Sequence, residues 1–538
     1  MRLMEPIRES AKGRRIAGLV VLALAIAAQS GPAAEQWNQW RGPARTGIDA
    51  DSPKLADAWP ATGPRLIWKN TEIPSGQEGG YGCLSLADGH GFIYVNWKTR
   101  TPIPQRKIDE NGLKTLGWSP QPVPEELLKP LEEARLSEER AALKGDALKK
   151  WIDQWVADHV KEDQKKDFGP FVSNRLTKGR QALAMLTLEK LATIKDKEFP
   201  TQDAIVAWFN QNGIESQDQR AILKVIPTTH DTSEDVVACV SLTDGKTVWK
   251  KACPGRATTW GSSCTPCVVD GRCYAVSERA LYCFDARSGE ELWKAPLKGK
   301  DTSSSPAVVD GVVVVLAGQL RGFDVKTGKE LWTAESIKGE NASPALWTKD
   351  GKTYLICNGW DAGCVDPRTG KVFWTVPGGG NGTAAIDGDI MLIVTMNEKV
   401  GLVAYRMSLE KAEKLWDAPI SDRGTTPILH DGHAYIMAAK KGGAAKTMCL
   451  SLADGQIKWE QKVNGEIASP VLADGKLIGV IEGGKTLLMF RATPEKYDEL
   501  ARIKMGVAAV TTPVLEGGRM YLRLADGIGC FDLVNPGQ

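Results

Sequence analysis

The ten residues FDARSGEELW, Phe284 to Trp293, are followed thirty-nine positions later by FDVKTGKELW, Phe323 to Trp332. Both phrases place an Asp-x-x-Ser/Thr-Gly segment between two apolar runs, and both end in tryptophan. Near-identical phrases about 40 residues apart are typical of repeat architectures, in which each repeat is one supersecondary unit. The number of further copies therefore decides the fold.

The tryptophan that ends the phrase recurs through the second half of the chain. From Trp249 onward, successive tryptophans are 44, 39, 42, 42 and 43 residues apart. One more, Trp68, lies in the short apolar segment PRLIWK. A large side chain at the end of an outer strand can pack between repeats, where its loss costs about 3–5 kcal/mol. This docking role is predicted for Trp68, Trp249, Trp293, Trp332, Trp374, Trp416 and Trp459.

A second phrase leads each copy, as in SSSPAVVDGVVVVL from Ser303 and TTPILHDGHAYIM from Thr425. It occurs seven times after residue 260, and an eighth copy begins at Tyr81. Asp-Gly between β-branched runs indicates a tight hairpin, because glycine supplies the positive φ that the turn needs. Two hairpins give a four-stranded antiparallel sheet of about 40 residues, the size of one propeller blade.

The blade count depends on how the two ends of the chain meet. The final copy, CFDLVNPGQ, stops before its tryptophan, whereas PRLIWK near the N-terminus has no hairpin before it. We therefore predict an all-β, eight-bladed propeller in which residues 64–96 supply the closing strand and the start of the first blade. Seven blades is the alternative, because the copy around MFRATPEKYDELARIKM lacks its tryptophan.

The period breaks inside the first blade. Trp68 and Trp249 are 181 residues apart, about 140 more than one repeat. The extra segment is rich in Lys, Glu, Leu and Ala, and Thr201 is a predicted helix N-cap. We predict an α-helical insertion over residues 97–235, with the remainder of the propeller over 236–538.

The N-terminus predicts export. A basic stretch, MRLMEPIRESAKGRR, precedes the apolar run IAGLVVLALAIAA and the small residues of QSGPAA. This is the pattern of a signal peptide, assigned to residues 1–33, and the mature chain is expected to have no transmembrane segment. The expected location is periplasmic or extracellular. Residues 34–63 are an N-terminal arm, of which 35–58 are expected to be dispensable for closure of the ring.

The chain has eleven cysteines, which in an exported protein would suggest disulfides. Five of them occupy one slot of the repeat, where sister copies have Gly322 or Ala404. We therefore expect most cysteines to be buried hydrophobic residues with free thiols. A redox pair at Cys264 and Cys267 is the alternative for CTPC. The five cysteines that share the slot are Cys239, Cys283, Cys364, Cys449 and Cys530.

The pattern small-x-Asp-x-x-Thr/Ser-Gly-x-x-x-Trp resembles the tryptophan-docking repeat of the PQQ-binding-like β-propellers. That family includes quinoprotein alcohol dehydrogenases and the propeller lipoprotein of the outer-membrane barrel-assembly machinery. The resemblance covers residues 64–96 and 236–538. In the dehydrogenases it implies a quinone over the axial channel, held against a disulfide between adjacent cysteines and beside calcium. This sequence has no Cys-Cys pair, and no cysteine precedes Cys83 to carry a lipid anchor.

Candidate site residues lie near the predicted inner strands. Five histidines are scattered, so neither a catalytic residue nor a metal ligand is assigned. Polar and aromatic side chains in the loops around the axis are the candidates for binding a ligand in the channel. They are Asn341, Asn381, Arg423 and Glu466, with Trp260 and Trp360 in neighbouring loops.

Two functions remain open. The favoured one is a non-catalytic, monomeric scaffold of the cell envelope, without a cofactor, that binds protein or polysaccharide through propeller loops and the helical insertion. The alternative is a periplasmic PQQ-dependent alcohol or sugar dehydrogenase with calcium. A net charge of +2 argues against nucleic acid as a partner.

Overall fold

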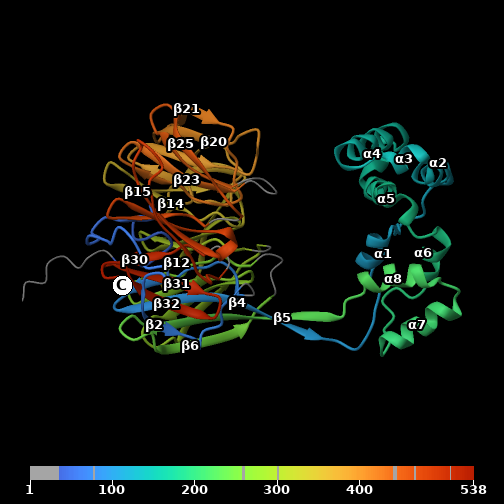
Figure 1. The fold of residues 1–538 in the computed structure, drawn as a ribbon, viewed down its shortest axis with the longest axis horizontal. Coiled ribbons are helices and arrows are strands. Elements are labelled where there is room, and N and C mark those ends of the chain that lie inside the picture. The colour runs from blue at the N-terminus through green and yellow to red at the C-terminus, as the bar shows by residue number, and fades with distance from the viewer. Residues whose placement is uncertain are drawn as a thin grey trace, which may run out of the picture.

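The computed structural model describes residues 36–76, 79–256, 261–299, 302–439, 445–465, 468–508 and 511–537. Eight β-sheets follow one another along the chain, and each is one blade of a propeller (Figure 1). The first strands of neighbouring blades contact each other, which places them around the axis. Eight blades are thus confirmed, and the alternative of seven is excluded.

The strands of the first four blades are, from the axis outwards, as follows. Blade 1 has β3 (Ser85–Ala87), β4 (His90–Pro102), β5 (Thr229–Ser241) and β6 (Thr247–Pro254). Blade 2 has β7 (Cys267–Val269), β8 (Arg272–Val276), β9 (Ala280–Asp285) and β10 (Glu291–Pro296). Blade 3 has β11 (Ala307–Val309), a long β12 (Val312–Asp324) that spans the place of two strands, and β13 (Glu330–Gly339). Blade 4 has β14 (Ala345–Lys349), β15 (Lys352–Asn358), β16 (Asp361–Val365) and β17 (Val372–Pro377).

The other four blades follow the same order. Blade 5 has β18 (Ala385–Asp387), β19 (Ile390–Val394), β20 (Leu402–Met407) and β21 (Ala412–Ala418). Blade 6 has β22 (Ile428–His430), β23 (His433–Ala439), β24 (Ala445–Ser451) and β25 (Ile457–Val463). Blade 7 has β26 (Val471–Ala473), β27 (Lys476–Ile481), β28 (Thr486–Arg491) and β29 (Glu499–Lys504). Blade 8 has β30 (Val514–Glu516), β31 (Arg519–Leu524), β32 (Gly527–Asp532) and, from the N-terminal side, β2 (Arg65–Asn70).

Each tryptophan of the repeat docks on the next blade. The indole nitrogen of Trp249 donates a hydrogen bond to the backbone oxygen of Ala286 in blade 2 at 2.9 Å. The turn glycine of blade 2, Gly289, has a φ of +70°, and an added Cβ there would lie 2.5 Å from the Trp249 ring. The glycine of the Asp-x-x-Ser/Thr-Gly turn is therefore required for two reasons: its backbone has a positive φ, and the tryptophan ring packs where a side chain would lie. The other six tryptophans make the same kind of bond: Trp68, Trp293, Trp332, Trp374, Trp416 and Trp459.

The small-residue slot lies directly opposite the tryptophan across the two outer strands. Cys239 pairs with Trp249, and Cys530 pairs with Trp68. In blade 3 the slot is Gly322, where an added Cβ would lie 2.2 Å from the Trp332 ring. All eleven cysteines have free thiols and ten are buried, as the sequence predicts for hydrophobic residues of a repeat.

The leading phrase also has a role in the ring. The residue before its proline accepts a hydrogen bond from the same position of the preceding blade. The backbone nitrogen of Thr265 donates to Ser305 Oγ at 2.9 Å, and that of Ser305 donates to Ser343 Oγ at 2.9 Å. The same bond joins Thr383 to Thr426 and Thr426 to Ser469. These hydroxyl groups therefore tie the first strands of successive blades together.

The ring closes as predicted, with β2 as the outer strand of blade 8. It pairs antiparallel with β32, and Trp68 then docks on Leu242 of blade 1. Blade 7 lacks its tryptophan, because Ala501 stands opposite the slot residue Met489. The acceptor that a tryptophan would use on blade 8, the backbone oxygen of Leu533, is bound by Ala56 N at 2.9 Å. The N-terminal arm thus replaces the missing docking residue.

The arm also enters the centre of the ring. Its backbone accepts hydrogen bonds from the first strands of blades 1 and 2, through Trp37 O with Leu86 N at 2.7 Å and Asn38 O with Val268 N at 2.8 Å. It then forms β1 (Ile48–Asp49), which pairs in parallel with β26 of blade 7. The inner edge of a first strand has no neighbouring strand, so its backbone groups need such partners.

The helical insertion is carried on a two-stranded ribbon. Strands β4 and β5 stay in register as far as the pair Pro102 and Thr229, and the helices lie beyond them (Figure 1). Residues 97–102 and 229–235, at the two ends of the expected helical insertion, are strand residues, because pairing across the ribbon continues despite their polar composition. The helices are α1 (Glu110–Leu116), α2 (Glu125–Leu136), α3 (Glu138–Ala142), α4 (Gly145–His159), α5 (Lys165–Lys178), α6 (Met185–Ala192), α7 (Gln202–Gln211) and α8 (Ser216–Val225).

The insertion has two small cores of its own. One contains Leu131, Trp155 and Phe171 from α2, α4 and α5, and the other contains Leu113, Leu188 and Phe209 from α1, α6 and α7. The Thr201 hydroxyl accepts a hydrogen bond from Ala204 N at 3.2 Å and caps α7 as predicted. Within the described ranges, no helix is long and apolar enough to cross a membrane.

Candidate functional site

The two faces of the propeller carry different loops. The turn face holds the Asp-Gly turns and the Asp-x-x-Ser/Thr-Gly turns of the blades. The opposite face, here called the linker face, holds the loops between second and third strands and the links that lead into each first strand. The insertion joins β4 to β5, so it emerges from the linker face (Figure 1). The described candidates of the sequence analysis, Asn341, Trp360, Asn381 and Arg423, lie in loops of this face.

Two of the candidates are in contact. Asn341 and Asn381 stand three residues before the equivalent positions Pro344 and Ala384, in successive blades. Asn341 Nδ2 donates a hydrogen bond to Asn381 Oδ1 at 3.3 Å. Ser303, in the same slot of blade 3, donates from Oγ to Asn341 Oδ1 at 2.8 Å. A polar arc therefore runs across blades 3, 4 and 5 on the linker face.

Trp360 lies beside this arc, in the loop between β15 and β16. Its side chain is 69% exposed. The neighbouring loop of blade 5 carries Met396, which is 50% exposed, and Asn381 Nδ2 donates to Met396 Sδ at 3.3 Å. Gly379 lies between the two loops, because its nitrogen donates to Gly359 O at 2.8 Å and its oxygen accepts from Met396 N at 2.9 Å. Sequence reasoning missed Met396.

Arg423 lies in a loop of the same face, in the next blade. It stands one residue earlier in the repeat than Asn341 and Asn381, in the link before β22, and it is half-buried. The adjacent Asp422 accepts hydrogen bonds from Gly424 N at 2.7 Å and Thr425 N at 2.6 Å, which fixes that link. Trp260 and Glu466 lie outside the described residues, as does the expected signal peptide 1–33.

The axis contains two buried arginines of the N-terminal arm, which sequence reasoning also missed. Arg41 donates to Pro427 O at 3.0 Å and Pro470 O at 3.1 Å, and Arg45 donates to Pro306 O at 2.9 Å. Burial lowers the pKa of Arg41 to about 9 and that of Arg45 to about 10, so both are charged at neutral pH. None of the described carboxylates pairs with either of them. The only sequence signal was the density of aromatic and basic residues in WNQWRGPAR.

A buried carboxylate lies at the root of the insertion. Asp235 on β5 accepts hydrogen bonds from Tyr94 Oη at 2.8 Å, Asn96 Nδ2 at 3.0 Å and Tyr282 Oη at 3.2 Å. Burial and then the Asp235 carboxylate raise the pKa of Tyr94 well above its ordinary value, so this phenol stays a donor. The three donors fix β4 and β5 against blade 2 and so set the direction in which the ribbon leaves the ring.

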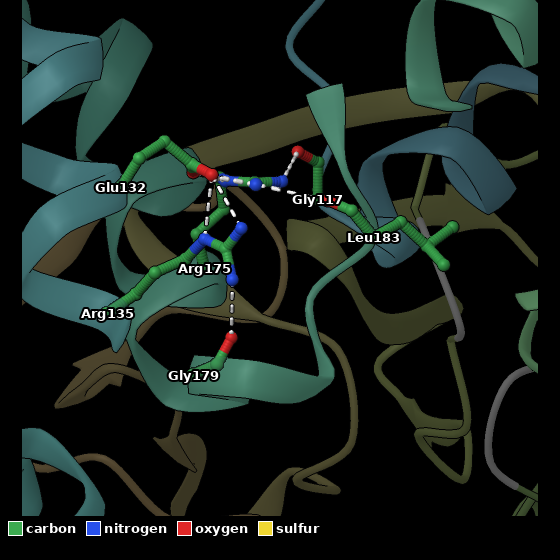
Figure 2. Close-up of polar contacts among 6 residues, drawn as sticks. All are labelled: Gly117, Glu132, Arg135, Arg175, Gly179 and Leu183. Atoms are coloured by element: carbon green, nitrogen blue, oxygen red, sulfur yellow. Dashed lines mark hydrogen bonds and ion pairs between the residues drawn. The ribbon is translucent and has the colours of Figure 1, made fainter. Parts of the chain in front are cut away.

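An ionic joint connects the two cores of the insertion (Figure 2). Arg175 on α5 is fully buried and donates to Glu132 Oε1 on α2 at 2.7 Å. It also donates to Gly117 O, at the end of α1, at 3.3 Å, and to Leu183 O, before α6, at 3.0 Å. Arg135 binds the other oxygen of Glu132 at 2.8 Å. Arg175 therefore holds the helices of one core to the ends of helices in the other.

The described groups at the axis come from the N-terminal arm and from the first strands that it binds. No described group of three or more His, Cys, Asp or Glu side chains converges to hold a metal ion. The inner edges that face the axis are bound by backbone and arginine groups of the arm. Cys264 and Cys267 are both buried, and burial raises the pKa of each thiol to about 12, which disfavours the thiolate that redox chemistry needs.

Comparisons with known proteins agree with the repeat. Residues 233–461 match the family described as outer membrane protein assembly factor BamB, which is less than half of the chain. The repeats are PQQ-like propeller repeats, as the sequence predicts. The tetrathionate hydrolase of Acidithiobacillus ferrooxidans is 24% identical over 231 residues, covering 41% of this chain and 42% of that protein. The chain thus matches less than half of the length of this curated relative.

Solved structures of two kinds are similar to the chain. BamB from Moraxella catarrhalis is 15% identical, with a TM-score of 0.46, over 56% of this chain and 90% of that chain. Quinohemoprotein alcohol dehydrogenase from Comamonas testosteroni is 13% identical, with a TM-score of 0.43, over 58% of this chain and 73% of that chain.

Proposed function

We propose that this chain is an exported, non-catalytic propeller that binds a protein or polysaccharide of the cell envelope through its linker face and helical insertion. The observation that carries this proposal is the position of the arm. Residues 37–49 bind the inner edges of blades 1, 2 and 7, and Arg41 and Arg45 bind those of blades 3, 6 and 7. Residues of the chain itself therefore lie at the axis and bind the first strands around it. A dehydrogenase of this fold would place its quinone over the same axis.

The linker face supports a binding function for a second reason. It carries the polar arc, the exposed Trp360 and the insertion on its ribbon, whereas the turn face is built from repeated tight turns. Loops that depart from the repeat on one face of a rigid scaffold are where binding residues concentrate. The matched family, described as outer membrane protein assembly factor BamB, offers a precedent for a scaffold of this kind.

Quinone titration separates this proposal from the alternative. The purified protein is mixed with PQQ and calcium, passed over a desalting column, and assayed for quinone absorbance and for dye reduction with alcohols and aldose sugars. We expect no stoichiometric quinone absorbance and no turnover. Stoichiometric binding with turnover would establish the dehydrogenase instead.

Photocrosslinking in the envelope tests the binding face. A photoreactive amino acid is placed at Asp361 on the linker face or, as the matched control in the same blade, at Asp350 on the turn face; both residues are exposed. We expect discrete crosslinked species from position 361 and from a third position, Asp153, on the insertion. Equal crosslinking from positions 350 and 361 would contradict the proposed face.

A further inference from the structure

The exposure of Trp360 does not follow from its position in the repeat. Several apolar side chains of the propeller are exposed because they precede a docking tryptophan on an outer strand, as Val248, Leu292 and Leu331 do. Trp360 has no such position. It is the most exposed of the large apolar side chains described, at 69%. A tryptophan held in water on a rigid face is typical of a binding surface, because burying its ring on a partner is strongly favourable.

The surroundings of Trp360 combine an apolar platform with amide groups. Trp360 N donates to Lys338 O of β13 at 2.7 Å, which fixes its loop against the neighbouring blade 3. Gly379 separates that loop from the loop of Met396, and its Cα position is open, with the nearest atoms to an added Cβ at 3.8 Å. The Met396 sulfur then contacts the Asn381 amide at 3.3 Å. The loop of Trp360 is therefore connected through Gly379 and Met396 to Asn381, which binds Asn341.

The polar arc repeats at the spacing of the blades. Ser303, Asn341 and Asn381 occupy one slot in three successive blades, and each binds the next through a hydrogen bond between side chains. Ser263 holds the same slot in blade 2, and its Oγ donates to the backbone oxygen of Ser303 at 3.2 Å. An asparagine amide has both donors and acceptors, and one bond between the two amides leaves further positions on each. The linker face therefore presents hydrogen-bonding groups in a row, beside one exposed aromatic ring.

We propose that this surface binds a neutral polysaccharide, with one sugar ring stacked on Trp360 and its hydroxyl groups bonded to Asn341 and Asn381. A pyranose ring has a face of C–H groups that packs on an aromatic ring, and hydroxyl groups that need donors and acceptors together. A repeating polymer also matches a row of repeated polar groups. This inference rests on the proposed function and names the ligand class of its linker face.

Charge and size favour a neutral glycan over other occupants. Trp360 is followed directly by Asp361, and its backbone nitrogen binds the backbone oxygen of Lys338, so residues of both signs adjoin it and no single-sign field selects an anionic polymer. A stable protein interface buries about 1,200–2,000 Å² with a contiguous apolar centre. Among the described residues, the exposed large apolar side chains of this surface are Trp360 and Met396, which suit one sugar ring better than a protein hot spot.

Calorimetry of the full chain tests the proposal. The probes are cellohexaose, xylohexaose, mannohexaose, maltohexaose and chitohexaose, titrated to millimolar concentration. We expect at least one to bind, with the dissociation constant raised about tenfold or more by Trp360→Ala and about threefold by Trp360→Phe, which keeps a ring. Asn341→Ala and Asn381→Ala should each weaken binding severalfold. Leu186→Ala, at a 64% exposed position on α6, is the control and should change nothing.

Two outcomes would overturn the inference. One is the absence of binding by all five oligosaccharides; the other is binding that Trp360→Ala leaves unchanged. Thermal melts accompany each variant, and because Trp360 is exposed, its replacement should not lower the melting temperature. If the oligosaccharides fail but protein crosslinks still form from position 361, the scaffold function stands with a protein partner. Quinone turnover, in contrast, would remove the proposed function itself.

Discussion

The Trp68 indole donates a hydrogen bond to the backbone oxygen of Leu242 at 2.9 Å, across 174 positions of sequence. Trp68 belongs to the strand that completes blade 8, and Leu242 belongs to blade 1, so this bond lies where the ring closes. Removing the indole leaves a cavity between two blades and an unsatisfied carbonyl. Closure of the ring therefore depends on a strand from the other end of the chain.

We expect Trp68→Ala to lower the free energy of unfolding by about 3–5 kcal/mol, measured by urea denaturation. The control is Leu66→Ala on the same strand, where the side chain is 47% exposed and the change should stay within about 0.5 kcal/mol. A chain that begins at residue 71 should aggregate, because β32 would then be an open edge. A monomeric, cooperatively unfolding product of that truncation would contradict the closure argument.

The arm gives a second prediction. Its contacts indicate that residues 35–58 stabilise the closed ring, contrary to the expectation from the sequence that they are dispensable for closure. Ala56 N binds Leu533 O in place of the missing tryptophan of blade 7, and Asp57 pairs with Lys476 at 3.3 Å and Arg491 at 3.2 Å. A chain beginning at residue 60 should lose several kcal/mol of stability, because the inner strands also lose their partners from the arm. An unchanged denaturation midpoint would show that the arm binds weakly.

Substitution of one buried arginine tests how much the arm stabilises the centre of the ring. Arg41→Met removes hydrogen bonds to Pro427 O and Pro470 O and leaves buried carbonyls unsatisfied, so we expect a loss of about 2–4 kcal/mol. The control is Arg65→Met, since Arg65 forms an exposed ion pair with Asp532 that is worth at most about 1 kcal/mol. Equal effects of the two substitutions would contradict a buried role for Arg41.

Residues that recur could be predicted from the sequence, and residues that occur once could not. The docking tryptophans, the small slot of Cys239 and the closing strand all follow from comparing copies with each other. The place of Arg41 depends on backbone groups more than 380 positions away, which no local pattern indicates. The ribbon residues beyond Trp97 and Glu234 are mostly polar and pair mainly with each other, so their sequence lacks the alternation of apolar and polar residues that indicates a strand.

The candidate site was only partly predictable for the same reason. Asn341 and Asn381 were found because they precede inner strands in equivalent places, and the structure brings them into contact. Met396 lies in a loop between second and third strands whose length differs from blade to blade, so alignment of the copies gives no expectation for it. Its proximity to Asn381 follows from the packing of neighbouring blades.

The pair across the outer strands gives a further prediction. Cys239 faces Trp249 in register, and sister blades have alanine or glycine in the place of the cysteine. Cys239→Ala should therefore cost about 1 kcal/mol or less, whereas Trp249→Ala should cost about 3–5 kcal/mol. Gly289→Ala should also be severe, because the new methyl group would meet the Trp249 ring at 2.5 Å. A severe Cys239→Ala would indicate a role for the thiol beyond packing.

The ionic joint of the insertion gives a prediction about pH. Burial raises the pKa of the Glu132 carboxyl, but the guanidinium groups of Arg135 and Arg175 outweigh burial and hold that pKa below its ordinary value of 4.5. Because the folded pKa is the lower one, the carboxylate stabilises the insertion above pH 4.5 and loses this effect as pH falls through the folded value. Glu132→Gln should therefore flatten the loss of helix stability below that pH, followed by circular dichroism at 222 nm.

Removing Arg175 tests the same joint at neutral pH. Arg175→Met breaks the link to Gly117 O and Leu183 O and should destabilise the helices by about 3 kcal/mol or more. The matched control is Arg180→Met in the same insertion, since Arg180 and Glu138 are an exposed pair whose loss should cost at most about 0.5 kcal/mol. Equal effects of the two substitutions would contradict a structural joint at Arg175.

The last prediction concerns the independence of the propeller from its insertion. Pro102 and Thr229 face each other in register, so the two ends of residues 103–228 are already adjacent. Replacing that segment with a short Gly/Ser turn closes a hairpin at little entropic cost. Because both helical cores consist of insertion residues, the ring should keep its stability while circular dichroism loses its helical signal and retains its strand signal.

The Asp235 cluster, which fixes β4 and β5 to blade 2, is kept in this variant and should hold the shortened hairpin in place. Loss of cooperative unfolding would mean that the insertion is part of the propeller's own fold, and the ribbon could then not be treated as a simple connector.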